Sequence, residues 1–505
     1  MFGTLFFLFA VLNCADQSEN EMLVSSRIVE AGLFKNGLVI VTEEIPLNGP
    51  GTYRLESLPE AIHGSLWVEA GDKIVARTSS RSHSKPLTST DLDDLTDVLN
   101  GEMVSLVFFG EEPELTGRLV GPSMGPMLVL ETQNGHLFVE KDRIETIRAH
   151  EKVTLERNVD KQVLLFQIGD TDASTIRFHY LTLGMSWAPS YHINLKPDGH
   201  MTLTQNAVIR NEWRDLNQTE LWLISGFPNY EFAHVTSPLT SDWHSFFNAM
   251  NRPTNSGQID LTANVMQQVR ISSRYDAWSE PTPGGEGLDS FRQRIGAFDL
   301  DSGEAIMIQT LQKAAPYQRI VCWEVANRRA PDGRNLSTSH NEHPLTVLEE
   351  WDALQFNNPF EVPMTTAPAA VYHQGNLAGQ SLSTWANPGA ATRIKVTRAL
   401  SVEANDHEWV EDGEQKEVKR YGNRYLQQHV KGSLAIRNTR TSVLDMEIVK
   451  RVTGRLVRAD GDPRVDLLEE GAYQVNLRTE LNWRLSLEPG EKVEFDYEYE
   501  VLVRI

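Results

Sequence analysis

The sequence predicts a mainly β protein with minor helix, in which stacked sheets bury alternate side chains. The first observation is the end of the chain, VEFDYEYEV, where apolar and acidic residues alternate over 493–501. A period of two puts each set on its own face of a strand, and no helix could gather that apolar set on one side. The second is the stretch 155–236, where short apolar runs are interrupted by Gly, Pro and Asn. Because no strand–helix–strand repeat is present, a parallel α/β sheet is disfavoured.

The last two strands are expected over 479–487 and 493–501, joined by the EPGE turn at 488–491. Pro489 and Gly490 suit the two central positions of a β-turn. We therefore expect a hairpin with one buried face, to which the first strand contributes Trp483. If each inward residue contributes about 2 kcal/mol, a one-residue slip would cost on the order of 10 kcal/mol, so the register should be well fixed.

Further strands are expected near the N-terminus, and two helices interrupt the strand pattern. GLVIVTEEIPL, GTYRLESLPEAI and SLWVEA are short strand patterns over 37–47, 51–62 and 65–70. DLDDLTDVL (91–99) predicts a helix because its Leu and Val side chains fall on one face. HPLTVLEEWDAL (343–354) predicts a second helix.

Residues 100–150 predict a small SH3-like β-barrel, with short strands, glycine-rich corners and a tight turn at Asn134–Gly135. This region contains GPSMG (121–125), which matches the G-x-S-x-G pattern of serine hydrolases. A nucleophile in that pattern needs a helix after it, whereas strands flank Ser123 on both sides. We therefore interpret Ser123 as a loop residue and not as a nucleophile.

The charge of the chain argues against nucleic acid as a partner. Lys and Arg number 47 against 69 Asp and Glu, which gives a formal net charge of -22. Phosphate backbones repel such a chain unless it has a separate basic face, and the two basic stretches, 270–275 and 327–334, are short and far apart in sequence.

The N-terminus resembles an export leader. An apolar run over 2–12 is followed by Asn13, Cys14 and Ala15, a length suited to a signal peptide and too short for a bilayer span. Two alternatives remain open: cleavage near Ala15, or attachment of a lipid anchor at Cys14. No later stretch has the length of a transmembrane span, so we expect an extracytoplasmic protein, which is periplasmic, at the cell surface or secreted.

The chain has two cysteines, Cys14 and Cys322. Removal or lipidation of Cys14 would leave one thiol, so stability must come from large cores and not from disulfides. Cys322 lies in the strand pattern RIVCWEV and is interpreted as a small buried hydrophobic residue.

Candidate metal sites are weak, and no cofactor is expected. HNEH offers His340, Glu342 and His343, without a third ligand position or the helical H-E-x-x-H frame of metallohydrolases. DLDSGE (299–304) and DGDPRVD (460–466) space carboxylates as calcium loops do, but both lack the full ligand set and are interpreted as polar turns. There is no nucleotide-binding glycine motif.

Tryptophans in loop-like segments are the candidate binding residues. Trp243, Trp278 and Trp385 lie among Asn, Ser, Gly and Pro, where an indole can stack on a sugar ring or anchor a protein partner. The alternative is that they are half-buried loop aromatics.

Several segments in order resemble a known family. They are LTLGMSWAPSYHINL (181–195) with AVIRNEWRDLNQTELWLISGFP (207–228), NNPFEVPMTTAPAAVYHQGNLAGQSLSTWANPGA (357–390), and GSLAIRNTRTSVLDMEIVKRV with LNWRLSLEPGEKVEFDYEYEV (432–452, 481–501). They resemble bacterial proteins containing domain of unknown function 4139, also called mucoidy-inhibitor-like. The family's TGEDW segment reads RNEWRD here, and a small barrel stands where many members have a coiled coil. The resemblance implies a multi-domain β-sandwich architecture and an exported protein, and it transfers no catalytic residue.

The expected organisation combines these observations. It comprises a leader (1–16), an N-terminal β region (24–85), the SH3-like barrel (88–150), a β-sandwich (155–400) with a mobile excursion at 237–292, and a C-terminal immunoglobulin-like sandwich (401–505). The favoured function is a non-enzymatic cell-envelope or secreted binding or structural protein. The alternatives are a glycan-binding protein that uses the loop tryptophans and a metal-dependent hydrolase centred on His340, Glu342 and His343.

Overall fold

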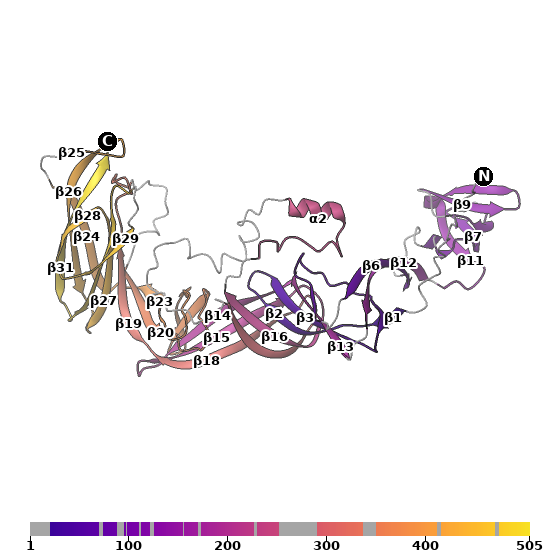
Figure 1. Ribbon diagram of the computed structural model, residues 1–505, viewed down its shortest axis with the longest axis horizontal. Coiled ribbons are helices and arrows are strands. Elements are labelled where there is room, and N and C mark those ends of the chain that lie inside the picture. The colour runs from indigo at the N-terminus through magenta and orange to yellow at the C-terminus, as the bar shows by residue number, and fades with distance from the viewer. Residues whose placement is uncertain are drawn as a thin grey trace, which may run out of the picture. The chain divides into compact units, whose positions relative to one another are not determined.

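The computed structural model confirms a mainly β protein with little helix (Figure 1). It describes residues 21–69, 74–87, 95–96, 98–110, 113–121, 126–154, 156–169, 173–226, 230–251, 290–336, 350–411, 416–469 and 474–505. Two compact units are formed from interleaved segments. Unit 1 comprises Met1–Ile28, Thr42–Tyr180 and His234–Arg252, and unit 2 comprises Val29–Val41, Leu181–Ala233 and Pro253–Ile505.

Three sheets contain the strands nearest the N-terminus, and the third of them also includes the later strands β16 and β17. The four-stranded sheet contains, in spatial order, β1 (Glu21–Val24), β4 (Gly51–Leu55), β12 (Glu156–Ile168) and β6 (Val75–Pro86). A five-stranded sheet contains β10 (Gly135–Glu140), β9 (Met127–Thr132), β8 (Leu115–Leu119), β7 (Met103–Phe108) and β11 (Ile144–Ala149), with a short 3-10 turn at Lys141–Arg143. A six-stranded sheet contains β17 (Ser290–Leu300), β16 (Leu216–Gly226), β2 (Arg27–Leu33), β3 (Leu38–Pro46), β13 (Thr175–Leu183) and β5 (Trp67–Glu69).

The other three sheets lie in unit 2. A five-stranded sheet contains β18 (Ala305–Pro316), β15 (His200–Asn211), β14 (Met185–Leu195), β21 (Pro368–His373) and β22 (Asn376–Leu382). A six-stranded sheet, here sheet F, contains β23 (Ala391–Arg398), β20 (Glu350–Asn357), β19 (Gln318–Val325), β27 (Leu444–Thr453), β30 (Arg478–Leu487) and β29 (Arg464–Glu469). The last, here sheet I, contains β24 (Val402–Val410), β26 (Asn423–Asn438), β31 (Lys492–Arg504) and β28 (Arg455–Ala459), and β25 (Lys416–Arg420) pairs with β26.

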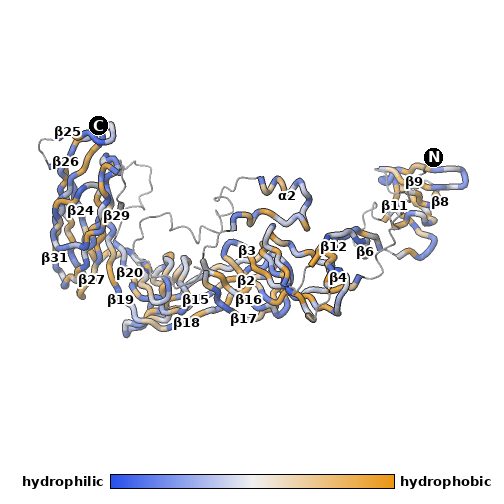
Figure 2. Tube along the Cα trace, in the orientation of Figure 1, coloured by the Kyte–Doolittle hydropathy of each residue, from blue (hydrophilic) through white to orange (hydrophobic). Residues whose placement is uncertain are grey.

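The core of the C-terminal sandwich is formed by residues of sheets F and I. Apolar and polar residues alternate along the strands of these sheets (Figure 2). On β31, Tyr497, Tyr499 and Val501 are almost fully buried, whereas the acidic residues between them are less buried. Trp483 on β30 enters the same core and stacks on Phe495 at 5.8 Å. The inward face expected for both strands is therefore confirmed.

The prediction that these two strands form a hairpin is wrong. β30 pairs with β27 in sheet F, and β31 pairs with β26 in sheet I, so the turn at 488–491 crosses from one sheet to the other. Gly490, with φ of 80°, makes that crossing. Alternation specifies which face of a strand is buried, but it does not specify the neighbouring strand.

One of the two expected helices is corrected and the other is partly confirmed. Glu350–Asn357 is strand β20, held between β19 and β23, and not the end of a helix. Its burial on successive residues suits a strand inside a sandwich, a pattern that periodicity alone does not separate from a buried helix. Around Leu99, whose amide donates to the Leu95 carbonyl at 3.0 Å, a helical turn is present.

The expected small barrel is an open antiparallel sheet with its own core. In the described residues its edges are β10 and β11, and its buried side chains include Val104, Leu106 and Leu130. The tight hairpin between β9 and β10 is confirmed, but its two-residue turn is Gln133–Asn134, one residue earlier than expected, because Gly135 pairs with Thr132 as the first residue of β10.

Three buried asparagines stabilise strand ends in unit 2. Asn211, Asn358 and Asn438 are 0–2% exposed. Each accepts, through Oδ1, the backbone N–H two residues ahead at 2.9–3.0 Å. Their Nδ2 groups donate to backbone carbonyls at 2.8–3.2 Å, namely those of Arg214 and Leu300, of Val362 and Ala386, and of Ser442, Leu487 and Glu488. The asparagine side chains thereby supply hydrogen-bond partners to backbone groups that the turns would otherwise leave unpaired.

Replacing Asn438 by alanine is expected to lower the free energy of unfolding by about 2 kcal/mol, because buried backbone groups lose their partners. Urea unfolding of the full chain measures the change. Asn405→Ala is the matched control, since Asn405 is exposed on β24 and should change stability by less than about 0.5 kcal/mol. Equal effects of the two substitutions would contradict this role.

Candidate functional site

Helix α2 (Trp243–Met250) lies in unit 1, inside the stretch that the sequence analysis expected to be a mobile excursion. Asp242 caps its N-terminus, because a side-chain oxygen accepts the Ser245 backbone N–H at 2.9 Å. That hydrogen bond holds the pKa of Asp242 below its usual value. The described part of the excursion, 237–251, therefore contains a capped helix. Residues 252–289 lie outside the described residues, and Ser290 begins β17.

One side of α2 is fixed to unit 1. Phe246 is 8% exposed and meets the His63 ring edge-on at 4.8 Å between centroids. His234 Nε2 lies 3.2 Å from the Ala249 carbonyl oxygen near the end of the helix. These contacts attach α2 to unit 1 through Phe246 and through the end of the helix.

Beside Phe246, whose ring contacts those of Trp243 and Phe247, α2 has an exposed apolar face. Trp243, Phe247 and Met250 are 64%, 54% and 38% exposed, and a spacing of four and then three residues aligns them along the helix. The rings of Trp243 and Phe247 stack at 5.2 Å with 19° between their planes. We call these three residues the α2 face. Large exposed apolar side chains on one line are typical of a binding surface.

Charge is absent from α2. Between Trp243 and Met250 the polar residues are His244, Ser245 and Asn248, and there is no Lys, Arg, Asp or Glu. The helix therefore offers aromatic and apolar contacts with no ionic contribution of its own.

The three tryptophans singled out from the sequence differ in their surroundings. Trp243 is the most exposed of those described. Trp385 is half-buried, donates its indole N–H to Asn387 Oδ1 at 2.9 Å and lies 6.3 Å from the Phe291 ring. Trp278 lies outside the described residues, as do Ser123 and Cys14. Of the two described candidates, Trp243 is the more exposed.

Metal ligation has no geometric support in the described residues. No group of three or more His, Cys, Asp or Glu side chains gathers there in a metal-binding arrangement. His340, Glu342 and His343 lie outside the described residues.

The two stretches that resemble calcium loops engage their carboxylates locally. Glu304 accepts the Asp301 N–H at 3.0 Å in the turn between β17 and β18. In the second stretch, Asp460 pairs with Arg458 and Asp466 pairs with Arg464. These contacts are those of hydrogen-bonded and charge-paired turns.

Cys322 lies on β19 as a buried free thiol, as the sequence analysis expected. Burial raises its pKa from the ordinary 9.0 to about 11, and the nearby Arg393, 3.8 Å from Sγ, only partly opposes this effect. Such a thiol is poorly nucleophilic at neutral pH.

We expect Cys322 in the native protein to react with a maleimide at least about 100-fold more slowly than in urea. The reason is that the thiolate fraction at a given pH falls about tenfold for each unit by which burial raises the pKa of the thiol. The measurement is the rate of mass labelling of the Cys14→Ser chain. Equal rates in the native and unfolded protein would contradict a buried thiol.

In the part of the chain that the structure describes, no helix is long and apolar enough to cross a bilayer.

Comparison with known families gives one match. The family model described as "Domain of unknown function (DUF4139)" matches residues 176–503. No curated protein matches the chain. The match covers the segments that contain the three buried asparagines, together with Trp187 and Tyr191, both 2% exposed. Tyr191 accepts the Thr365 N–H at 2.8 Å, and burial raises its pKa to about 12, so the described signature residues support the core.

Proposed function

Since this chain belongs to the family of domain of unknown function DUF4139, whose description assigns no activity, we propose that it is a non-enzymatic, exported binding protein. Its binding element is the α2 face, and its ligand is a partner protein of the cell envelope or the surrounding medium. The observation that carries the proposal is the alignment of Trp243, Phe247 and Met250, all exposed, on a helix that the neighbouring Phe246 attaches to unit 1.

The chemistry of the α2 face favours a protein groove as its receptor. Side chains four and seven residues apart are the usual anchors when an amphipathic helix enters an apolar groove. A membrane surface is a weaker fit, because helices that lie on anionic lipid carry Lys and Arg, and α2 has neither.

The proposal includes the finer architecture and the location. We take the C-terminal pair of sheets and the sandwich before it as immunoglobulin-like, and residues 88–150 as SH3-like. The apolar run over 2–12 supports export, followed by cleavage near Ala15 or lipidation of Cys14. Sequencing the mature N-terminus tests this part: a native chain that still begins at Met1 would contradict export.

A photocrosslinking amino acid in place of Phe247 tests the binding element in the producing cell. We expect Phe247 to crosslink to one defined protein. Phe138 on β10 is the matched control, because it is 69% exposed and lies on another surface of unit 1. The same protein captured equally from both positions, or no protein captured from Phe247, would contradict the proposal.

The captured protein then permits a quantitative prediction. Trp243→Ala with Phe247→Ala is expected to weaken its affinity for the purified chain at least about 10-fold, because buried aromatic anchors dominate such interfaces. Trp67→Ala is the control, since Trp67 is 60% exposed on β5, and it should leave the affinity unchanged. Calorimetry or surface plasmon resonance provides the measurement, and thermal unfolding verifies that each variant is folded.

Glycan binding is the second candidate, favoured by the 64% exposed indole of Trp243, which a sugar ring could stack upon. A glycan array separates the two. Binding of an oligosaccharide that is lost in Trp243→Ala and kept in Trp67→Ala would favour the glycan over the protein.

A further inference from the structure

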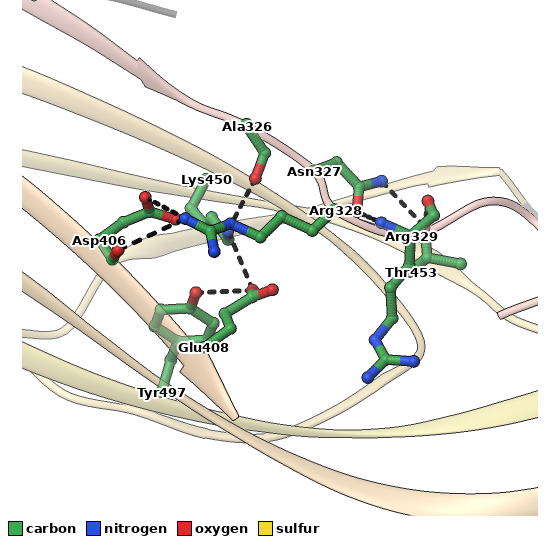
Figure 3. Close-up of polar contacts among 9 residues, drawn as sticks. All are labelled: Ala326, Asn327, Arg328, Arg329, Asp406, Glu408, Lys450, Thr453 and Tyr497. Atoms are coloured by element: carbon green, nitrogen blue, oxygen red, sulfur yellow. Dashed lines mark hydrogen bonds and ion pairs between the residues drawn. The ribbon is translucent and has the colours of Figure 1, made fainter. Parts of the chain in front are cut away.

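The C-terminal sandwich encloses an amine between two carboxylates (Figure 3). Lys450, on β27 of sheet F, is 0% exposed. Its Nζ lies 2.9 Å from Glu408 Oε1 and 3.6 Å from Asp406 Oδ2, both on β24 of sheet I. It also donates to the Ala326 carbonyl at 2.8 Å, and the Tyr497 ring lies 5.4 Å from it. One buried amine therefore faces two acids from the opposite sheet.

The two carboxylates are held differently. Glu408 Oε1 accepts both the Lys450 ammonium and the Tyr497 hydroxyl, the latter at 2.7 Å. Asp406 Oδ1 accepts from Arg328 at 2.8 Å at the rim of the site, whereas Asp406 Oδ2 is buried and makes no hydrogen bond. The oxygen that faces the amine is thus the one that no hydrogen-bond donor satisfies, an expensive state for a buried carboxylate.

We propose that Lys450 and Asp406 condense to an amide bond that covalently joins the two sheets of the C-terminal sandwich. Nζ forms the new bond with Cγ of Asp406, the Cγ–Oδ2 bond breaks, and Oδ2 departs as water. The two protons that Nζ gives up end on that water, and a neutral amide replaces the charged pair. No atom changes oxidation state, so no external reagent is needed.

Each neighbouring group has a role in this step. Glu408, in contact with Nζ, accepts a proton from the ammonium and passes it toward Oδ2, which is general acid–base catalysis within hydrogen-bond reach. Arg328 donates to Oδ1, where negative charge develops in the tetrahedral intermediate. Tyr497 orients Glu408. The fold holds the reacting groups in contact, which replaces the entropy cost of bringing them together.

The enclosure favours the amide over the ion pair. Loss of two opposite charges is favourable where water is excluded, because a buried ion pair recovers its desolvation cost only partly. The link would also supply a covalent constraint that the described residues otherwise lack, since Cys322 is the only cysteine among them. It would tie β24, an edge strand of sheet I, to β27, an interior strand of sheet F.

The test is mass spectrometry of the full chain purified in its folded state and then denatured. A tryptic digest should contain a branched peptide that joins the segments around residues 406 and 450, with the combined mass lower by one water. Fragmentation should place the link at Asp406. Linear peptides with free Lys450 and free Asp406 in a folded, aged sample would overturn the proposal, and a link at Glu408 would overturn the assignment of the acceptor.

Three variants separate the roles. Lys450→Arg and Asp406→Ala should lack the branched peptide because a reacting group is missing. Glu408→Gln should keep both reacting groups but form the link at least about 100-fold more slowly, the usual scale for loss of a general acid–base group. Lys431→Arg is the matched control, because Lys431 pairs with Glu411 at 2.6 Å at the surface and should leave the branched peptide unchanged. Unaltered linking in Glu408→Gln would overturn the role of Glu408, and circular dichroism verifies that the variants fold.

Discussion

Replacing Lys450 by methionine is expected to lower the free energy of unfolding by about 3–5 kcal/mol, the usual cost of leaving one member of a buried ion pair alone. Glu408, 7% exposed, would lose the cation that neutralises it and keep only the hydrogen bond from Tyr497. Urea unfolding of the full chain, followed by tryptophan fluorescence, measures the loss. Any amide link to Asp406 is lost as well, and mass spectrometry of the starting protein shows whether that link was present.

Two further variants show whether this loss arises from the buried charge. Lys431→Met removes a surface ion pair whose lysine is 31% exposed, and it should cost about 1 kcal/mol or less. Adding Glu408→Gln to Lys450→Met should recover part of the loss, because the uncompensated carboxylate is removed. A cost for Lys450→Met no larger than that for Lys431→Met would contradict the buried network.

Replacing Lys35 by methionine is expected to stabilise the protein on the order of 3 kcal/mol at neutral pH. Lys35 is 9% exposed at the turn between β2 and β3, and in the described residues its ammonium makes no hydrogen bond or ion pair. The nearest compensation is the Trp187 ring, 5.2 Å away. Burial therefore lowers its pKa from 10.5 to about 7.

The pH dependence follows from that lowered pKa. Between about pH 7 and 10.5 the unfolded chain binds more protons at Lys35 than the folded chain does, so this residue makes stability rise with pH in that window. Below pH 7 its cost is complete, and above 10.5 it vanishes. The gain from Lys35→Met should thus be largest at pH 6.5 and should shrink by pH 10. A gain that is independent of pH, or a loss at pH 6.5, would contradict a desolvated lysine.

The fold class follows from the sequence because burial on one strand face is a local property. The pattern around Tyr497 and Tyr499 gives the inward face directly. The partner strands are not local: β31 pairs with β26, and the sequence between them contains strands of the other sheet. Turn chemistry at 488–491 was the same for a hairpin and for a crossing, so the wrong alternative could not be rejected.

The candidate helix was missed although its signals are present. Asp242 is a good N-cap, and apolar residues at 243, 246, 247 and 250 follow helical spacing. The flanking segments are rich in Asn, Pro, Ser and Gly. That composition favours a loop, and eight residues of helical spacing are too few to oppose it. The opposite error occurred at 343–354, where apolar spacing favoured a helix and pairing with two neighbouring strands fixed Glu350–Asn357 as β20.

The buried amine also has a sequence signal, visible once β27 is known. Met446, Ile448 and Val452 lie on one face of that strand, and Lys450 occupies the same face in the same period. On β24, Asp406 and Glu408 continue the inward face of Val402. Charged residues of opposite sign at inward positions of two strands predict a buried ion pair, but only the fold shows that these two strands meet.

The crossing turns of the C-terminal sandwich have a kinetic consequence. β27, β28 and β29 each lie in the sheet opposite to that of the preceding strand, and Gly454, with φ of 149°, makes one of these crossings. Few strands can therefore form a hairpin with the next strand in the sequence, and segments distant in sequence must pair before much apolar surface is buried. Chains dominated by such non-local pairing fold in milliseconds to seconds, far more slowly than helical bundles. Refolding of the C-terminal sandwich should accordingly be slow. Its yield should be higher in dilute protein, because strand edges that are not yet paired remain exposed and can aggregate.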